Sequence, residues 1–398
     1  MAARGIFIVG AKRTPFGSFG GSLSRVSATE LAVVSSKAAL ASVGMDPAVI
    51  DATFVGNVIQ SSPDACYLAR HVALKVGARV DTPALTVNRL CGSGFEAVIQ
   101  GTEAIQLGKA SVALCVGAEN MSSAPLLVAG NDVRWGVALG TGLKMEDSLW
   151  AGLTDSHAGL PMGMTAENLA GKYGITREQC DAYALRSQTQ WSYGNAKGAF
   201  SAELAPIEVK TKKGPKVVDT DEHPRPSSAE KMAALRPVFK KDGVVTAANA
   251  SGICDGAGSL LLAGESALKQ NKITPLARVV ATHEIGCDPA IMGIGPANAI
   301  RGALKKAGLT LGDMDLIEIN EAFAAQYLAV EKELGLERSK TNINGGAIAL
   351  GHPLGASGSR IMAHLTHELS RKGLKYGIGA ACIGGGQGIA IIIENVSQ

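Results

Sequence analysis

Cys91 is the residue whose surroundings best suit a nucleophile. It lies in the stretch NRLCGSG (residues 88–94), after a strand-like run at residues 84–87 and before a helix with apolar Phe95 and Val98. A helix dipole stabilises the thiolate of a cysteine at the start of the helix, and the flanking glycines leave the sulfur open to a substrate. Free cysteines are more commonly buried and inert, but this position predicts a reactive one.

His352 is the candidate general base. It lies in GHPLGASG (residues 351–358), a second glycine-rich turn that leads into a helix. Most lone histidines are structural, but an imidazole beside a helix start can take a proton from a nearby nucleophile. An internal repeat places His352 opposite Asn88 in an equivalent turn, so we expect Cys91 and His352 to meet at one junction.

Cys382 is a third candidate, in AACIGGGQG (residues 380–388), where a strand ends and glycines allow a sharp bend. Exposed amides at such a bend can form an oxyanion hole. A phosphate cradle is the rival interpretation, although no Lys-Ser or Lys-Thr pair follows as in a P-loop.

His364 and His367 lie three apart on one helix face without a third metal ligand nearby. We therefore predict no metal site and interpret them as ordinary surface or packing residues.

The elements that must position these residues follow from the repeat, which has a single offset of 264 residues, the separation of Leu40 and Leu304. The same offset aligns residues 90–94 with residues 354–358. Each copy has the order helix, β-rich run, turn, strand, glycine-rich turn, helix, strand, which indicates βαβ units around a largely parallel sheet. The predicted fold class is α/β, with two such sheets facing each other through their helices.

The repeat also suggests how the chain is divided. Residues 121–250 have no counterpart in the repeat, so we expect an inserted loop domain there that carries binding. The N-terminal half then comprises residues 1–120 plus about 251–272, and the C-terminal half comprises residues 273–398.

Composition and charge exclude several classes of protein. A chain of 398 residues that is 46% hydrophobic and 18% charged can bury more than one core. The net charge of +3, without a basic stripe, argues against a nucleic-acid partner. A long uncharged stretch, residues 378–393, contains several glycines, so we expect buried strands and a soluble protein without a transmembrane helix. Seven widely spaced cysteines without a C-x-x-C pair favour a reducing compartment and no structural zinc.

The N-terminal residues resemble an organelle-targeting segment, because residues 1–28 contain no acidic side chain. The basic residues in this segment are Arg4, Lys12, Arg13 and Arg25. The pattern predicts import into the mitochondrial matrix, with a cytoplasmic location as the alternative, although residues 6–9 also have the pattern of a first strand. The C-terminus, residues 395–398, lacks the peroxisomal tripeptide.

Four sequence blocks resemble the motifs of the thiolase family, in the order in which that family has them. They are NRLCGSG at residues 88–94, NEAFA at residues 320–324, GHP at residues 351–353 and C-x-G-G-G-x-G at residues 382–388. The resemblance extends along essentially the whole chain. It implies the thiolase fold, in which the duplicated units form a layered α/β/α/β/α core with an inserted loop domain.

The resemblance also implies a catalytic role for five residues. Cys91 becomes acylated, His352 activates it, and Cys382 exchanges a proton with the acetyl carbanion of the substrate. Asn320 holds a water that, with His352, stabilises the enolate oxygen of the thioester. The amides of Cys91 and Gly384 form the second oxyanion site.

Coenzyme A is a co-substrate of this family, and no cofactor is bound permanently. The resemblance implies contacts to coenzyme A from Arg225, Ser228, Ser251 and Met162. A solvated cationic loop is the alternative interpretation of Arg225. Family members restricted to acetoacetyl-CoA tend to carry His-Met-Gly where this chain has Pro-Met-Gly at residues 161–163, which favours a degradative enzyme with a broader range of acyl chains.

The implied activity is CoA-dependent cleavage of 3-ketoacyl-CoA to acetyl-CoA and a shortened acyl-CoA in fatty-acid β-oxidation, by a homo-oligomer arranged as a tetramer of two dimers. The first alternative is an acetoacetyl-CoA thiolase that works in the condensing direction. Decarboxylating ketoacyl synthases share the duplicated fold but need a Cys-His-His set, whereas the third position here is Cys382. Loss of Cys91, His352 or Cys382 would favour a non-catalytic acyl-CoA-binding scaffold, and all three are present.

Overall fold

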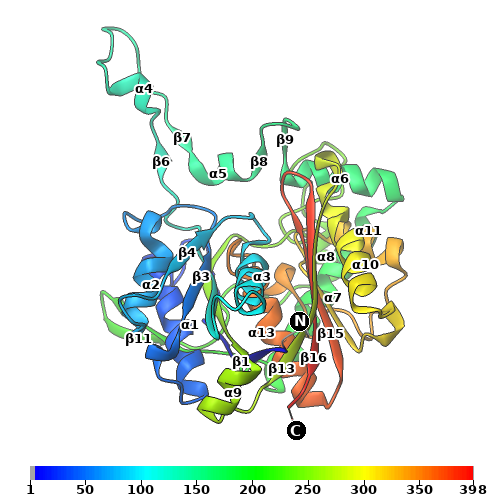
Figure 1. Ribbon diagram of the computed structural model, residues 1–398. Helices are drawn as coiled ribbons and strands as arrows, with labels where there is room; N and C mark the ends of the chain where they lie inside the picture. The colour runs from blue at the N-terminus through cyan, green and yellow to red at the C-terminus, as the bar shows by residue number, and fades with distance from the viewer. Residues whose placement is uncertain (1–4, 398) are drawn as a thin grey trace.

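The computed structural model describes residues 5–397, and its core is a ten-stranded mixed sheet (Figure 1). Along the hydrogen-bonded path the strands are β14 (Leu316–Ile319), β15 (Tyr376–Ile383), β16 (Gln387–Asn395), β13 (Ala277–Gly286), β1 (Ile6–Arg13), β12 (Cys254–Gly264), β5 (Val112–Asn120), β3 (Ala52–Gly56) and β4 (Ala84–Val87), and β2 (Gly17–Ser18) pairs with β12 beside the path. Runs of β-branched residues, such as the three consecutive isoleucines of β16, suit strands that are buried on both faces.

The two halves of the sheet join at β1 and β13, which pair only through Phe7 with Arg278 and Ile8 with Ala277. The two sheets expected to face each other through their helices are therefore joined into one, and the expectation that they are largely parallel is wrong. β3 is parallel to β4 and β5, and β14 is parallel to β15, but the other pairs along the path are antiparallel. One cause is that β15 turns directly into β16, and such a hairpin makes neighbouring strands antiparallel.

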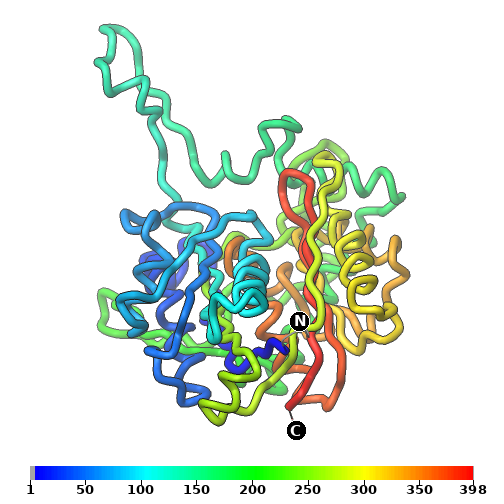
Figure 2. Tube along the Cα trace, viewed as in Figure 1, coloured from blue at the N-terminus to red at the C-terminus, as the bar shows by residue number. Residues whose placement is uncertain are grey.

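Helices lie between the two halves of the sheet and on both outer faces (Figures 1 and 2). The central pair is α3 (Ser93–Gln106) and α13 (Ser357–Lys372). The outer helices are α1 (Ala28–Ser42) and α2 (Leu68–Val76) on the N-terminal half, and α10 (Gly295–Ala307) and α11 (Ala324–Leu334) on the C-terminal half. The central helices approach closely because both carry glycine: a Cβ at Gly94 would lie 2.6 Å from the backbone nitrogen of Ser359. The result is the layered α/β/α/β/α arrangement that was expected.

The duplication is visible in matching elements and in matching contacts. α3 and α13, β3 and β14, and β5 and β15 begin at the predicted offset from one another. In the first half, Asp51 accepts hydrogen bonds from the amides of Ser111 and Val112. In the second half, Asp315 accepts them from the amides of Lys375 and Tyr376, at the start of β15. The same carboxylate therefore anchors the same strand in both copies.

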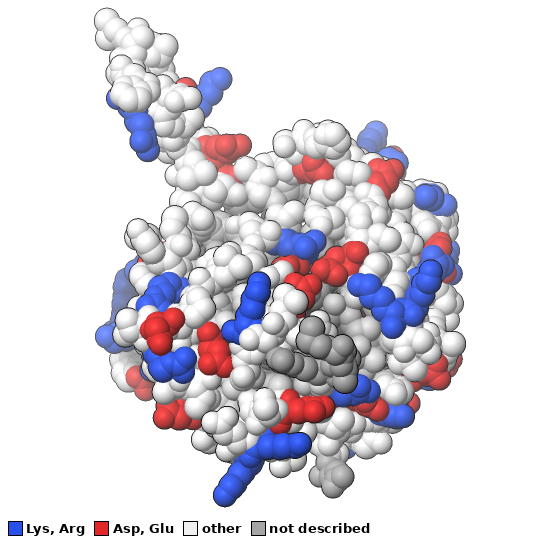
Figure 3. Space-filling model, viewed as in Figure 1, with Lys and Arg blue, Asp and Glu red and all other residues white. Residues whose placement is uncertain are grey.

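The region without a counterpart in the repeat contains helices, hairpins and a protruding segment. Its elements are β6 (Leu126–Leu127), α4 (Gly130–Val133), β7 (Glu146–Asp147), α5 (Ser148–Gly152), β8 (Thr154–Asp155), β9 (Leu160–Pro161), α6 (Met162–Tyr173), α7 (Arg177–Ala196), β10 (Ile207–Thr211), β11 (Gly214–Val218) and α8 (Ala229–Ala233). The segment from β6 to β7 extends away from the body (Figures 1 and 2), and its tip is largely uncharged (Figure 3). Exposed apolar side chains on it include Leu126, Trp135, Leu139, Leu143 and Met145.

The remaining helices are α9 (Glu265–Asn271) and α12 (Ala347–Leu350), and short 3-10 turns are η1 (Pro47–Val49), η2 (Ala65–Tyr67), η3 (Pro289–Ile294) and η4 (Leu311–Asp313).

The basic N-terminal pattern includes strand β1, where Arg13 is fully buried and pairs with Glu203 and Asp221. Lys12 and Arg13 of this pattern therefore belong to the folded sheet. Arg4, and the last residue of the C-terminal tripeptide, lie outside the described residues.

Candidate active site

Cys91 lies in the turn between β4 and α3, here named the nucleophile turn (residues 88–94). Leu90 has a φ of +46°, an uncommon left-handed conformation for leucine. The hydroxyl of Ser93 holds this turn, because Ser93 Oγ accepts from the amide of Arg89 at 2.8 Å and donates to the carbonyl of Leu90 at 2.7 Å. The strained backbone is thus fixed by the first residue of the helix, and it presents Cys91 at the strand end.

His352 lies in the equivalent turn before α13, here named the base turn (residues 352–358). Its amide donates to the carbonyl of Gly252 at 2.9 Å, and its Nδ1 lies 2.5 Å from Ser357 Oγ. Since Ser357 Oγ donates its own proton to the carbonyl of Pro353 at 3.0 Å, it must accept from Nδ1–H of His352. Nε2 therefore carries the lone pair, which is the form that a general base needs.

Cys91 and His352 line one cavity of about 340 Å³. Its walls are mostly apolar and include Phe19, Met121, Leu149, Trp150, Leu153, Phe239, Ile253, Met292, Phe323 and Leu354. Cys382, at the end of β15, is fully buried and packs with Met292 and Ala322, which line the cavity. Cys91 and His352 therefore face an apolar space that suits a hydrocarbon chain, and Cys382 packs against residues of its wall.

Burial controls the protonation of the catalytic groups. It raises the pKa of Cys91 to about 11, although the amides of Gly384 and Cys91 itself oppose that change. Burial and the charge of Arg360 lower the pKa of His352 to about 3. The pair is thus a neutral thiol and a neutral imidazole. At Cys91 desolvation therefore outweighs the stabilisation of the thiolate by the start of the helix.

The amide of Gly384 faces the sulfur of Cys91, since a hydrogen bond from it lowers the pKa of that thiol. Gly384 lies in the turn between β15 and β16, where Gly385 and Gly386 have φ values of +78° and +83°. A Cβ at Gly384 would lie 3.2 Å from the sulfur of Met162. The absence of a side chain at Gly384 therefore leaves space beside Cys91 for an oxyanion. The amide of Gly384 can donate a hydrogen bond to that oxyanion.

Cys382 and Asn320 complete the group. Burial raises the pKa of Cys382 well above its usual value, so this thiol keeps a proton that it can donate. Asn320 follows β14, and its Nδ2 lies 3.2 Å from His352 Nε2. Its Oδ1 is buried and has no partner among residues 5–397, which leaves it free to hold a water molecule or a substrate atom.

The four residues predicted to contact coenzyme A fall in two places. Met162 and Ser251 line the cavity that holds Cys91. Arg225 is exposed and lines a second cavity of about 440 Å³ beside α7, with Trp191 and Tyr193 among its other walls. Ser228 lines neither of these cavities, and its side chain caps α8 by accepting from the amide of Lys231 at 3.3 Å. The structure therefore places Arg225 and Ser228 outside the reaction cavity.

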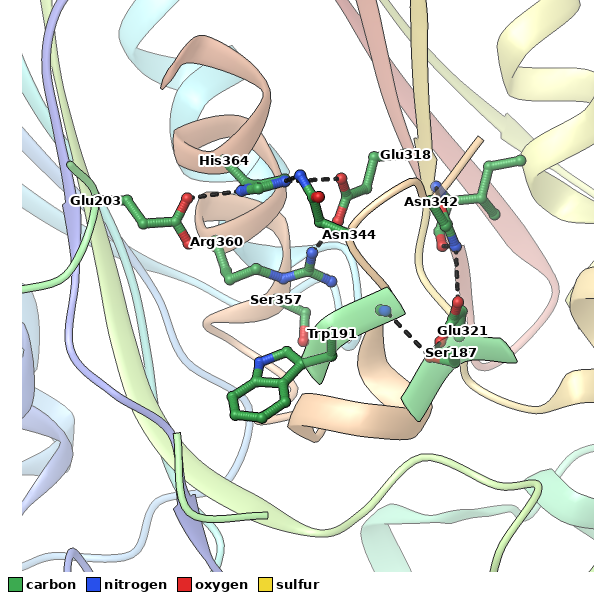
Figure 4. Close-up of polar contacts among 12 residues, drawn as sticks. Ser187, Trp191, Glu203, Glu318, Glu321, Asn342, Asn344, Ser357, Arg360 and His364 are labelled. Carbon is green, nitrogen blue, oxygen red and sulfur yellow. Dashed lines mark hydrogen bonds and ion pairs between the residues drawn. The ribbon is translucent and has the colours of Figure 1, made fainter. Parts of the chain in front are cut away.

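Of the two interpretations of His364, surface or packing residue, the structure supports the second, and it adds buried ionic partners that were not expected. It is buried between Glu203 and Glu318 (Figure 4), with its Nδ1 2.7 Å from Glu203. Arg360, one turn earlier on α13, pairs with Glu318. These ion pairs join the helix that begins at Ser357 to distant segments. His364 and Glu203 lie 161 residues apart in the sequence, so no local pattern signals the contact.

The sequence did not single out Ser357 or Glu119, and His367 packs as expected. His367 is partly buried, with its Nε2 2.8 Å from the carbonyl of Ala11. Glu119 accepts from the amides of Ile59 and Gly355, and burial raises its pKa to about 7. It therefore ties a loop of the first half to the base turn. The repeat offers a signal for Ser357, because it occupies the same position as Ser93.

No group of three or more His, Cys, Asp or Glu side chains within residues 5–397 is arranged to hold a metal ion. No helix in the same range is long and apolar enough to cross a membrane.

Comparisons with known proteins agree with this geometry. The mitochondrial 3-ketoacyl-CoA thiolase of Homo sapiens is 60% identical over 395 residues, which cover 99% of both chains. The crystal structure of human mitochondrial 3-ketoacyl-CoA thiolase in complex with CoA has a TM-score of 0.96 at 58% identity, covering 99% of this chain and 98% of that one. An acetyl-CoA acetyltransferase of Syntrophomonas wolfei is 44% identical over 98% of this chain and 99% of its own.

Two family profiles cover nearly the whole sequence. The profile of the thiolase N-terminal domain matches residues 6–266, and that of the thiolase C-terminal domain matches residues 273–395. Together with the duplicated fold and the convergence of Cys91, His352 and Cys382, they show that this chain belongs to the thiolase family.

Proposed function

We propose that this acyltransferase is a 3-ketoacyl-CoA thiolase, which uses CoA to cleave 3-ketoacyl-CoA to acetyl-CoA and an acyl-CoA shortened by the acetyl unit. The observation that carries the proposal is the meeting of a protonated thiol, Cys91, and a neutral imidazole, His352, at an apolar cavity, with the protonated thiol of Cys382 packed against its wall. Cleavage of a carbon–carbon bond beside a thioester needs a nucleophile, a base and a proton donor, and these groups supply all three. The relatives at 60% identity carry the same name.

In the first half-reaction, His352 Nε2 takes the proton of Cys91 and the sulfur attacks the ketone carbon. The bond between that carbon and its neighbour breaks, and the electron pair remains on the acetyl-CoA fragment. Cys382 protonates this carbanion, and the shortened acyl group stays on Cys91 as a thioester. A water molecule held by Asn320 Oδ1 and the protonated His352 donate to the enolate oxygen, while the amides of Cys91 and Gly384 stabilise the oxyanion at the attacked carbon.

In the second half-reaction, the thiolate of Cys382 takes the proton of an incoming CoA thiol. The CoA sulfur then attacks the thioester carbon, and the bond to Cys91 breaks. His352 returns its proton to Cys91. Because one acyl-enzyme serves both halves, initial-rate lines for ketoacyl-CoA and CoA should be parallel. Intersecting lines, as a ternary complex gives, would contradict this mechanism.

Replacement of Cys382 separates the two halves of the reaction. Cys382→Ser should still exchange an acyl group between acyl-CoA and labelled CoA, because that step needs Cys91, His352 and the amide donors. Thiolysis should fall by about 10²- to 10⁴-fold, the usual contribution of general acid–base catalysis. Equal loss of exchange and thiolysis in a folded variant would show that Cys382 is not a dedicated proton donor.

The acyl-chain range decides between the proposed activity and its alternative. Relatives at 44% to 46% identity are named acetyl-CoA acetyltransferase. The apolar walls Leu149, Trp150 and Leu153 favour substrates longer than acetoacetyl-CoA. We therefore expect CoA-dependent cleavage of 3-ketoacyl-CoA across several chain lengths. Cleavage of acetoacetyl-CoA alone would favour the condensing enzyme instead.

The region of residues 121–250 is proposed to bind coenzyme A, between an N-terminal half (residues 1–120 with about 251–272) and a C-terminal half (residues 273–398). Met162 and Ser251 lie at the reaction cavity, where the thiol end of the ligand must enter. Arg225 and Ser228 are exposed or partly exposed farther along the same region, where phosphates can be bound. The relative with a CoA-bound crystal structure supports this assignment.

We also propose that the protein is a homo-oligomer, a tetramer of two dimers, in the mitochondrial matrix. The protruding segment exposes Trp135 and Leu139, and monomers rarely leave such apolar side chains in water. Light scattering coupled to gel filtration tests the tetramer, and a monomer would contradict it. The mitochondrial names of the relatives at 60% identity favour the location, which fractionation of cells can check.

A further inference from the structure

His223 is a buried histidine that lies outside the catalytic group. It precedes α8 and is 7% exposed. Its ring packs against Gly252: a Cβ on that glycine would lie 2.0 Å from His223 Nε2 and 2.4 Å from its Cδ2. The ring therefore fills a space that only a glycine at this position leaves open.

The hydrogen bonds of His223 determine its tautomer. Nδ1 lies 2.7 Å from the carbonyl of Ala349, and since a carbonyl can only accept, Nδ1 carries the proton. Nε2 then has a lone pair, which accepts from Arg225 Nη2 at 3.4 Å. Burial and the charge of Arg225 lower the pKa of His223, which keeps the ring neutral. The ring thus holds the guanidinium through an acceptor.

The other contacts of His223 lead to the catalytic base. Ala349 belongs to α12, which ends just before His352. Gly252, which supports the ring of His223, accepts the amide proton of His352 at 2.9 Å. His223 therefore contacts two segments that position His352. Ala349 lies just before it in the chain, and the carbonyl of Gly252 binds its amide.

Gln188 on α7 forms a second bridge between the same two places. Its Oε1 accepts from the amide of Arg225 at 3.1 Å, and its Nε2 donates to the carbonyl of Ile348 at 3.3 Å. The last carbonyls of α12 have no hydrogen-bond partners within the helix. His223 and Gln188, which also bind Arg225, donate to the carbonyls of Ala349 and Ile348. Two parallel links thus run from Arg225 to the segment before His352.

We propose that His223 is a positioning residue that holds Arg225 ready for the phosphates of coenzyme A and, through Ala349 and Gly252, steadies the turn that carries His352. This inference rests on the proposed function, in which Arg225 contacts coenzyme A. His223 itself touches neither the reacting atoms nor the ligand. Nε2 of His223 binds Arg225, and Nδ1 binds Ala349 in the segment before His352.

Two substitutions separate these tasks. In His223→Asn, the amide nitrogen replaces Nδ1 and keeps the bond to Ala349, but no acceptor faces Arg225. We expect KM for CoA to rise by about 3- to 10-fold, the equivalent of one hydrogen bond, with kcat within about twofold of wild type. In His223→Gln, the amide oxygen replaces Nε2 and the bond to Ala349 is lost, so kcat should fall by about 3- to 10-fold while KM for CoA stays within about twofold.

Pantetheine as the acyl acceptor provides the control, because it has the thiol of CoA but lacks the nucleotide phosphates. The KM defect of His223→Asn should be absent with pantetheine and should also be absent in an Arg225→Ala background, where the acceptor has no partner. The kcat defect of His223→Gln should persist with both acceptors. This pattern distinguishes a positioning role from a general loss of stability, which would alter the melting temperature without the split.

The proposal is overturned if both variants lower only the melting temperature, or if both change KM and kcat in the same proportion. The proposal is also overturned if Arg225→Ala leaves KM for CoA unchanged while thiolysis proceeds. In that case the proposed cleavage reaction still holds, because it does not depend on Arg225. Absence of thiolysis in the wild-type enzyme would instead refute the proposed function.

Discussion

The nucleophile turn and the base turn are one structural element used twice, with different chemistry in each copy. Both lead into a central helix, the first from the edge strand β4 and the second from the short helix α12. Both central helices begin with serine, Ser93 in α3 and Ser357 in α13. Ser93 binds the backbone of its own turn. Ser357 instead accepts from the ring of His352.

This difference shows how a duplicated site can specialise without a change of fold. In the first copy the serine supports a strained leucine, Leu90, that presents Cys91. In the second copy no residue from His352 to Ser357 has a positive φ, and the hydroxyl sets the tautomer of the base instead. One hydroxyl thus acts on backbone geometry and the other on protonation.

Removal of the nucleophile should have the largest effect. Cys91→Ala should lower thiolysis by about 10⁴- to 10⁶-fold, the range seen when a nucleophile is lost from an enzyme that works through an acyl intermediate. Rates and mass spectrometry of the acyl-enzyme measure it, with the exposed Cys66→Ala as a matched control. Acylation elsewhere in an active Cys91→Ala protein would place the nucleophile outside this turn.

The two serines should fail differently when replaced by alanine. Ser357→Ala removes the acceptor for His352 Nδ1–H, so kcat should fall by about 10- to 100-fold, as with other groups that orient a catalytic histidine. Ser93→Ala should mainly lower stability, by about 1–3 kcal/mol, because it leaves the part-buried amide of Arg89 without its partner.

Urea unfolding and steady-state kinetics on both proteins decide this comparison. If the two serine variants lose activity and stability to the same extent, the turns are not specialised in the way described.

The neutral state of Cys91 and His352 predicts how labelling depends on pH. Because the pKa of Cys91 is raised to about 11, its thiolate fraction should rise about tenfold for each pH unit between pH 7 and pH 10. Alkylation of Cys91 by iodoacetamide, measured by peptide mass spectrometry in the ligand-free enzyme, should rise with it. A flat profile would indicate a preformed thiolate and imidazolium pair.

The strain at Leu90 should give the smallest effect, and its sign is the test. Glycine is normally less stable than alanine, but at a left-handed φ only glycine avoids a clash. Leu90→Gly should therefore be more stable than Leu90→Ala by about 1 kcal/mol in urea unfolding. At Leu354, the equivalent position without positive φ, the order should be reversed. If the alanine variant is more stable than the glycine variant at both sites, Leu90 stores no strain.

Much of the candidate site could be predicted because its signals are local. The bounds of β4 and the start of α3 follow from an apolar run and a glycine-rich turn, so the place of Cys91 was predicted from its neighbours. His352 and Ser357 share one such turn, and the offset of the repeat relates it to the first. The resemblance to the thiolase family supplied the roles, which local patterns do not contain.

The sequence by itself determined which residues sit at strand ends and helix starts, because backbone conformation depends on neighbours within a few positions. Only the tertiary structure decided the joining of the sheet at β1 and β13, the neutral state of Cys91, and the links of His364 and His223. These properties arise from burial and from partners far apart in the chain. Their free energies depend on what packing brings together and on how much water it removes.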